Sequence, residues 1–132
     1  MPEKLQFDLV APERAIASVE ADIVEAPGVE GMIGVLPGHA PFMTVLAPGC
    51  VTYTIDGAQT RIFVRGGFAE VTPAGLTILA EEAVPVAELD RSEIERRIKD
   101  CEEDLADADT TPETRLRAER EVVELREVLA AL

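Results

Sequence analysis

The distribution of glycine and proline divides this 132-residue chain into two parts. All nine glycines lie between Gly28 and Gly75, and eight of the nine prolines lie at or before Pro85. Frequent glycine and proline end regular elements early, whereas a stretch that almost lacks them can form long helices. We therefore expect one domain over residues 1–85 and a second over residues 86–132.

Regular alternation of apolar and polar side chains predicts β-strands in the first part. Apolar residues occupy every second position of residues 5–9 and of residues 51–55, the period of a strand with one buried face. Asp56-Gly57 follows the second segment directly and favours a tight hairpin turn, because both turn positions can adopt a positive φ angle.

Further strand signals follow this turn. Residues 61–65 are predicted as the return strand, Gly66-Gly67 as its end, and residues 68–72 as its resumption. Residues 73–75 hold proline and glycine and predict a turn before a last strand over residues 76–80. Short strands at this spacing predict an antiparallel β-sandwich or barrel of about 8 to 10 strands.

Two helical stripes dominate the second part. Apolar residues recur there three and four positions apart, the spacing of one face of an α-helix. The first series is Ile94, Ile98, Cys101, Leu105 and Ala108, and the second is Ala118, Val122, Leu125, Leu129 and Leu132. The short gap between them predicts an antiparallel two-helix hairpin. Its stripes are narrow, so we expect a weakly held element that is able to rearrange.

Short polar side chains mark where each helix begins. Asp90 or Ser92 can cap the first helix, and Thr110 or Thr111 can cap the second. Pro112 fits the first turn of the second helix, where its missing N–H is harmless. The sequence leaves both pairs of alternatives open.

The charge of the chain excludes several classes of function. Asp and Glu number 26 against 12 Lys and Arg, which gives a net charge of −14. This acidity argues against binding to nucleic acid and to an anionic membrane surface. No window approaches the roughly 18 apolar residues of a membrane span. The N-terminus lacks a basic and apolar signal sequence, so the chain is expected to stay in the cytosol.

No constellation of residues suggests an active site. His39 is the single histidine and has no partner at metal-ligand or catalytic spacing. Cys50 and Cys101 lie in segments of different composition and are expected to be reduced thiols. The serines, Ser18 and Ser92, fit no catalytic triad. We therefore expect no catalytic residue, no metal and no cofactor.

Two further segments admit a chemical and a structural interpretation. The glycines of residues 28–38 are able to cradle phosphate, but no lysine or helix signal follows them, and Pro37 and Pro41 oppose a helix. A protruding loop and a bulged strand around an exposed Met32 fit better. The acidic residues 102–104 point in different directions on a helix and form a solvated face instead of a cation site.

The segment Gly34–Pro41, with the sequence GVLPGHAP, resembles a segment of the epsilon subunits of F-type ATP synthases, which are called delta in mitochondria. Further matches lie in register with it: Thr44, Leu46, Pro48-Gly49, Gly66-Gly67-Phe68, Glu70-Val71 and Thr77–Ala80. The order of a sandwich followed by a helical hairpin also agrees with that family. The resemblance covers essentially the whole chain.

This resemblance implies a rotor subunit without catalytic activity. In the family, the sandwich lies at the foot of the central stalk, where it binds the gamma subunit and the c-ring. The hairpin either folds on the sandwich or extends along gamma, contacts the alpha and beta subunits transiently, and blocks ATP hydrolysis in many members. The implied location is the cytoplasmic face of the bacterial plasma membrane, as a peripheral subunit without direct lipid insertion.

The resemblance also implies two sets of site residues. The loop that faces the c-ring is formed by Val29, Glu30, Gly31 and Met32. The residues that face gamma are His39, Ala40, Pro41 and Thr44. Many members carry a polar or acidic residue at the position of Met32, so the ring contact of this chain is expected to be more apolar.

An alternative is an ATP-sensing subunit whose hairpin clamps nucleotide. Members that bind ATP carry Ile/Leu-Asp-x-x-Arg-Ala at the first helix, whereas this chain reads Leu89-Asp90-Arg91-Ser92-Glu93-Ile94. Glu93 stands where the arginine belongs and would repel a triphosphate. The second helix could still supply positive charge for ATP binding, from Arg115, Arg117, Arg120 and Arg126. A β-sandwich adaptor unrelated to the synthase is a third alternative.

Overall fold

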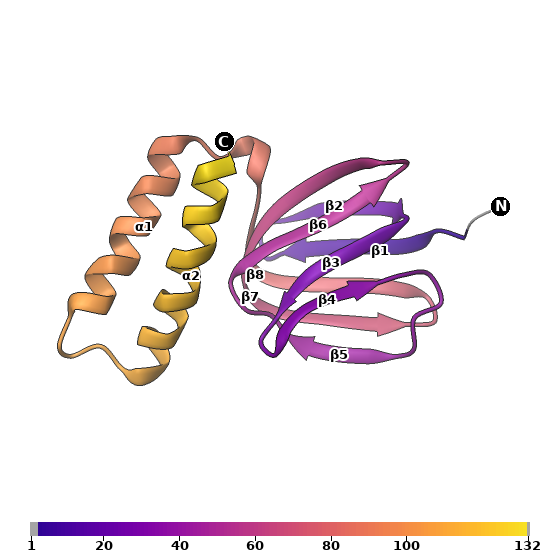
Figure 1. Ribbon diagram of the computed structural model, residues 1–132. Coiled ribbons are helices and arrows are strands. Elements are labelled where there is room, and N and C mark those ends of the chain that lie inside the picture. Colours follow the sequence, from indigo (N-terminus) through magenta and orange to yellow (C-terminus); the bar gives the residue numbers. More distant parts are fainter. Residues whose placement is uncertain (1–2, 132) are drawn as a thin grey trace. The chain divides into compact units, whose positions relative to one another are not determined.

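The computed structural model describes residues 3–131, which form eight strands, a short 3-10 helix and two α-helices (Figure 1). The strands are β1 Leu5–Ala11, β2 Arg14–Ala21, β3 Ile23–Gly28, β4 Gly31–Val35, β5 Phe42–Val45, β6 Gly49–Ile55, β7 Ala58–Thr72 and β8 Gly75–Pro85. The helices are η1 Val86–Glu88, α1 Arg91–Ala106 and α2 Pro112–Ala131. The predicted fold class, a β-sandwich followed by a two-helix hairpin, is confirmed. The chain divides into two compact units, Met1–Pro85 and Val86–Leu132.

Strand β7 connects the two layers of the sandwich. The strand order is β2-β1-β8-β7-β6-β3-β4, and β5 also pairs with β7. The first half of β7 pairs with β6 and its second half with β5. We call β2, β1, β8, the second half of β7 and β5 the first layer. The predicted break at Gly66-Gly67 is instead a bend within one continuous strand, made with φ angles of 72° and 105°.

One strand pair departs from the predicted antiparallel arrangement. Strands β1 and β8 run parallel, with Phe7 opposite Leu76 and Leu9 opposite Ile78, whereas the other strand pairs are antiparallel. Parallel neighbours need a long connection between them, and these two strands are separated by most of the sandwich sequence. The pairing therefore depends on the tertiary fold and leaves no local sequence signal.

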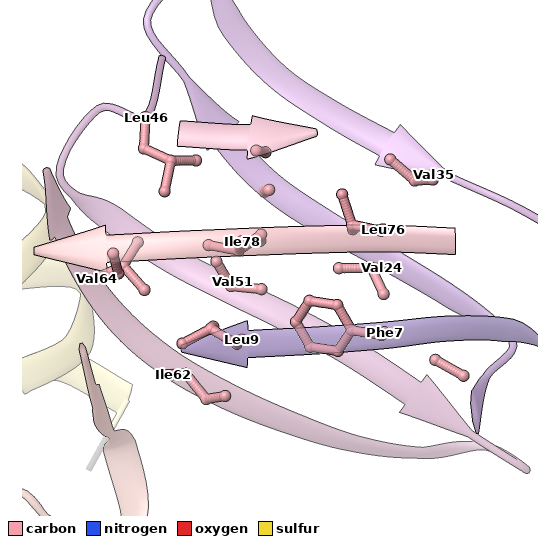
Figure 2. Close-up of a cluster of buried hydrophobic side chains, with 14 of the residues drawn as sticks. Phe7, Leu9, Val24, Val35, Leu46, Val51, Ile62, Val64, Leu76 and Ile78 are labelled. Carbon is pink, nitrogen blue, oxygen red and sulfur yellow. The ribbon is translucent and has the colours of Figure 1, made fainter. Parts of the chain in front are cut away.

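The core of the sandwich is built mainly from aliphatic side chains that point inward from both layers (Figure 2). Leu5, Phe7 and Leu9 are buried, as their alternation along β1 predicts. The Phe7 ring also lies 5.5 Å from the ring of Tyr53, measured between centroids. Burial of this kind is the main favourable term for a domain of this size.

The hairpin turn between β6 and β7 has the predicted conformation. Asp56 has a φ angle of 49° and Gly57 one of 84°. The Lys4 Nζ atom bridges this turn to a second carboxylate, because it contacts Asp22 Oδ1 and lies 3.1 Å from Asp56 Oδ1. The Asp56 N–H donates to Asp22 Oδ2 at 2.7 Å. The hydrogen bond from Lys4, followed by that from the Asp56 backbone, lowers the pKa of Asp22 below its ordinary value of 3.8.

Replacing Asp22 by asparagine is expected to lower the thermal unfolding midpoint at neutral pH. Since the folded-state pKa of Asp22 is lowered, its carboxylate stabilises the fold above pH 3.8, and this contribution is lost as the pH falls through the folded-state value. Unfolding midpoints of wild type and Asp22→Asn, measured from neutral to strongly acidic pH, should therefore converge at the acid end. Glu25→Gln, at an exposed position, is the control. A constant difference at every pH would contradict the expectation.

Caps and turns define the helical unit. The Asp90 carboxylate accepts a hydrogen bond from the Glu93 N–H at 2.7 Å, and the Thr111 hydroxyl accepts one from the Thr114 N–H at 3.1 Å. Of the alternatives for each helix start, Asp90 and Thr111 are therefore the caps. Arg115 on α2 donates to the carbonyl oxygen of Leu105 at 2.9 Å, which braces the end of α1.

The buried faces of the two helices agree with the predicted stripes in part. Ile94, Ile98 and Cys101 on α1 are buried, as are Ala118, Val122 and Leu125 on α2. Ala108 was predicted to extend the first stripe, which is wrong: α1 ends at Ala106, and Ala108 is exposed in the loop. Val128 is buried where Leu129 was predicted, and Leu129 is half-buried. Leu132 lies outside the described residues. No helix within residues 3–131 is long and apolar enough to cross a membrane.

Candidate functional site

The four residues predicted to face the c-ring lie together at the tip of the β3–β4 hairpin. Val29 and Glu30 form the turn, and Gly31 opens β4 with a φ angle of 135°. All four are exposed, and the Met32 side chain is 61% accessible. The glycine-rich segment is thus a projecting hairpin with an apolar and an acidic side chain at its end. More of this segment is β-strand than the predicted protruding loop implies, because residues 31–35 pair with β3.

Backbone hydrogen bonds connect this tip to the end of β5. The Val29 N–H donates to the Val45 carbonyl at 3.0 Å, and the Ala47 N–H donates to the Pro27 carbonyl at 2.8 Å. A Cβ atom on Gly28 would lie 2.9 Å from the Gly31 carbonyl oxygen, so glycine permits the close approach. The tip is therefore a braced projection of the sandwich.

Three of the four residues predicted to face gamma lie together between β4 and β5. His39, Ala40 and Pro41 are exposed. The His39 N–H donates to the Leu36 carbonyl at 3.1 Å, and His39 Nδ1 lies 2.7 Å from the Ala40 carbonyl oxygen. Because a carbonyl only accepts, this contact assigns the proton to Nδ1. The ring centroid lies 6.3 Å from that of Phe42 in an edge-on arrangement. His39 is thus a hydrogen-bonded loop residue.

Thr44 is separated from these three residues. It lies near the opposite end of β5, about 10 Å along an extended strand from Pro41. It pairs with the buried Ala69, and its half-buried side chain contacts the space beside Gly28. The outward positions of β5 are those of Met43 and Val45, which are 58% and 59% accessible. The side chains that face outward beside Thr44 are therefore those of its two neighbours.

The loop that carries His39 borders two open depressions. One, of about 600 Å³, is lined by residues 3–6, 37–41 and 71–75. The other, of about 290 Å³, is lined by Ile33, Gly34, Val35, His39 and Phe42. Neither gathers catalytic groups, and no cluster of three or more His, Cys, Asp or Glu suited to a metal ion occurs in the described part of the chain.

The outer face of the first layer carries an apolar row that was not among the predicted sites. Val45 on β5 lies opposite Phe68 on β7, Phe68 lies opposite Leu79 on β8, and Leu79 lies opposite Val10 on β1. Their side chains are 59%, 38%, 41% and 37% accessible, in that order. We call these four residues the outer row. A sequence signal existed at Leu79, where consecutive apolar residues replace the alternation of a half-buried strand.

Glu93, which stands where nucleotide-binding members of the family carry arginine, has a carboxylate that is paired with two arginines. Glu93 Oε1 accepts a hydrogen bond from Arg96 Nη2 at 2.6 Å and lies 3.4 Å from Arg97 Nε. The hydrogen bond from Arg96 is the main cause that lowers the pKa of Glu93. Glu93 therefore stays ionised and holds two neighbouring arginines.

Comparison with known proteins gives consistent similarities. Residues 4–86 match the family model described as ATP synthase, Delta/Epsilon chain, beta-sandwich domain. The ATP synthase epsilon chain of Maricaulis maris is 55% identical over 108 residues, covering 82% of this chain and 81% of that protein. The ATP synthase epsilon chain of Hyphomonas neptunium is 44% identical over 133 residues, covering 100% of this chain and 98% of that protein.

Solved structures extend the similarity of fold. A chain from the mitochondrial ATP synthase of Euglena gracilis, in a structure of OSCP/F1/c-ring, has a TM-score of 0.77 at 24% identity. The match covers 99% of this chain and 82% of that one. A chain from the central stalk/c-ring of the Tetrahymena thermophila mitochondrial ATP synthase has a TM-score of 0.64 at 15% identity, covering 97% and 98%. At these identities the likeness concerns the fold.

Proposed function

The chain belongs to the delta/epsilon family of ATP synthase subunits, and we propose that it is a non-catalytic rotor subunit of the central stalk. In this role it couples proton-driven rotation of the c-ring to ATP synthesis through gamma. It is a peripheral component of the synthase on the cytoplasmic face of the bacterial plasma membrane. The observation that carries the proposal is the match over residues 4–86, which includes both candidate surfaces.

The tip of the β3–β4 hairpin is the proposed contact with the c-ring. Val29 and Met32 offer apolar surface there, and Glu30 offers a carboxylate. The backbone bonds from Val29 and Ala47 support a contact that has to bear force, because they join the tip to neighbouring strands. A braced hairpin transmits a displacement better than a free loop does.

Met32→Asp is expected to lower coupled ATP synthesis while leaving the fold intact. The side chain is largely exposed, so the substitution should change the free energy of unfolding by about 0.5 kcal/mol or less. It places a charge where the proposed ring contact is apolar. ATP synthesis driven by a proton gradient is measured in membrane vesicles, with Glu25→Gln as the control at an exposed site outside the tip. Unchanged synthesis would remove Met32 from the contact.

The proposed gamma contact begins at the loop of His39, Ala40 and Pro41 and continues along β5. Thr44 belongs to this contact through its strand, whose outward side chains are Met43 and Val45. The hydrogen bonds of His39 hold the loop in one conformation, which lowers the entropy lost on binding. Co-elution of the purified chain with gamma in size-exclusion chromatography tests the proposal. Two folded proteins that elute separately would contradict it.

We propose that the hairpin of α1 and α2 regulates ATP hydrolysis through transient contacts with the alpha and beta subunits. It forms a compact unit of its own, and Arg115 braces its turn. The alternative function, an ATP sensor that clamps nucleotide with the hairpin, is disfavoured by the ionised Glu93. Saturable ATP binding by the isolated chain in calorimetric titration would instead favour the sensor.

A further inference from the structure

The C-terminal end of α1 lacks the usual means of stabilising a helix end. Helices commonly end beside a glycine in the left-handed conformation, which lets backbone N–H groups bond the last carbonyl oxygens. Residues 86–132 contain no glycine, and α1 is followed by Asp107 in an extended conformation, with φ −76° and ψ 120°. The last turn of α1 also contains no basic residue. Its carbonyl oxygens therefore depend on donors from outside the helix.

Negative charge is concentrated at the same end of α1. Asp or Glu occupies six of the ten positions 100–109, and none of the ten is Lys or Arg. The aligned peptide dipoles already place partial negative charge at the C-terminus of a helix, so carboxylates there are unfavourable. One of them, Glu102, has its Oε2 atom 3.5 Å from Arg126 Nη2 of α2. The positive charge that opposes the repulsion at this end thus comes from the second helix.

Arg115 on α2 supplies the missing donors. Its Nη1 donates to the Leu105 carbonyl oxygen at 2.9 Å, and its Nη2 donates to the Asp107 carbonyl oxygen at 3.4 Å. A guanidinium holds its N–H groups in one planar fork, so one side chain can bond two carbonyl groups. The two helices lie side by side (Figure 1). These bonds therefore exist only while α2 lies against the end of α1.

We propose that Arg115 is a latch between the two helices, so that separating α2 from α1 and unwinding the last turn of α1 are one event. The other end of α1 is capped by its own segment, because the Asp90 carboxylate accepts a hydrogen bond from the Glu93 N–H at 2.7 Å. A hairpin that opens therefore loses order at one end of α1 only. This loss opposes opening, and the inference concerns the helical unit alone, whether or not the chain binds gamma.

Hydrogen exchange of backbone amides in the full chain, followed by NMR, tests this inference. Arg115→Met removes the donors and the charge, and the amides of residues 105–107 are expected to exchange about tenfold faster or more. The Asp107 N–H is the most direct reporter, because it donates to the Glu103 carbonyl oxygen at 3.1 Å. Arg115→Lys keeps the charge and should show a smaller rise. Arg117→Met, at an exposed position of the same helix, is the control and should exchange like the wild type.

The start of α1 gives an internal reference in every variant. The amides of Glu93 and Ile94 bond to Asp90 and are expected to exchange at the wild-type rate in Arg115→Met. Unchanged exchange at residues 105–107 would overturn the inference. An equal rise at both ends of α1 would overturn it too, because Arg115 would then hold the helices together without capping α1. Thermal unfolding checks that each variant folds, and Arg115→Gln takes the place of Arg115→Met if that variant does not.

Discussion

Gly67→Ala is expected to destabilise the sandwich by about 3 kcal/mol or more. Gly67 has a φ angle of 105°, which a residue with a Cβ atom rarely adopts. A Cβ atom placed there would lie 1.9 Å from the Leu79 carbonyl oxygen and 2.8 Å from Ala80 Cα. Both obstacles are backbone atoms of the neighbouring strand, so relief requires the pairing of β7 with β8 to shift.

Urea unfolding of the full chain measures this loss. Gly34→Ala is the matched control, because a Cβ atom at Gly34 meets nothing within 4 Å. The control is expected to change the free energy of unfolding by about 0.5 kcal/mol or less. Since β5 carries the proposed gamma contact and pairs with this half of β7, Gly67→Ala should also weaken gamma binding. An equal effect of the two substitutions would show that the bend of β7 tolerates a side chain.

A chain that ends at Val86 is expected to fold, to bind gamma as the full chain does, and to lose all regulation by the hairpin. The hydrophobic core cluster of the sandwich draws its described members from residues between Leu5 and Ala83. The truncation therefore removes none of these side chains. In the assembled synthase, ATP hydrolysis should rise when the hairpin is absent, because the proposed contacts with the alpha and beta subunits are lost.

Circular dichroism during heating tests the folding of this truncated chain, and an ATPase assay of the synthase tests its regulation. The full chain is the reference in both experiments. A truncated chain without a cooperative transition would show that the hairpin is needed for the stability of the sandwich. A cooperative transition with unchanged hydrolysis would instead contradict only the regulatory role.

Local signals in the sequence predicted the elements that short-range physics determines. The alternation at Leu5, Phe7 and Leu9, the positive φ angles of Asp56 and Gly57, and the pair of candidate caps for each helix all depend on neighbouring residues. The division of the chain by glycine content likewise follows from backbone freedom. These features required no knowledge of which strands meet.

The features that sequence analysis missed depend on long-range pairing. A Gly-Gly pair such as Gly66-Gly67 can end a strand or bend it, and the neighbouring strand decides between the two. Here β7 continues through the pair, because Gly67 lies opposite Ala80 of β8. The parallel pairing of β1 with β8 has the same origin.

The candidate site was predictable only where its residues are adjacent in sequence. The tip residues 29–32 lie together because a hairpin turn contains them, and His39, Ala40 and Pro41 lie together in one loop. Thr44 lies apart, since alternation along β5 directs its side chain toward the inner face. The outer row joins four strands, and its existence depends on registers that no single segment encodes.

Affinity purification of the tagged full chain from detergent-solubilised membranes tests the central claim most directly. The tag is placed on the chain in cells that express the cognate synthase, and the recovered proteins are identified by mass spectrometry. We expect gamma and the c-ring subunit to be recovered with the chain. A folded chain recovered with neither gamma nor the c-ring subunit would contradict its assignment as a rotor subunit.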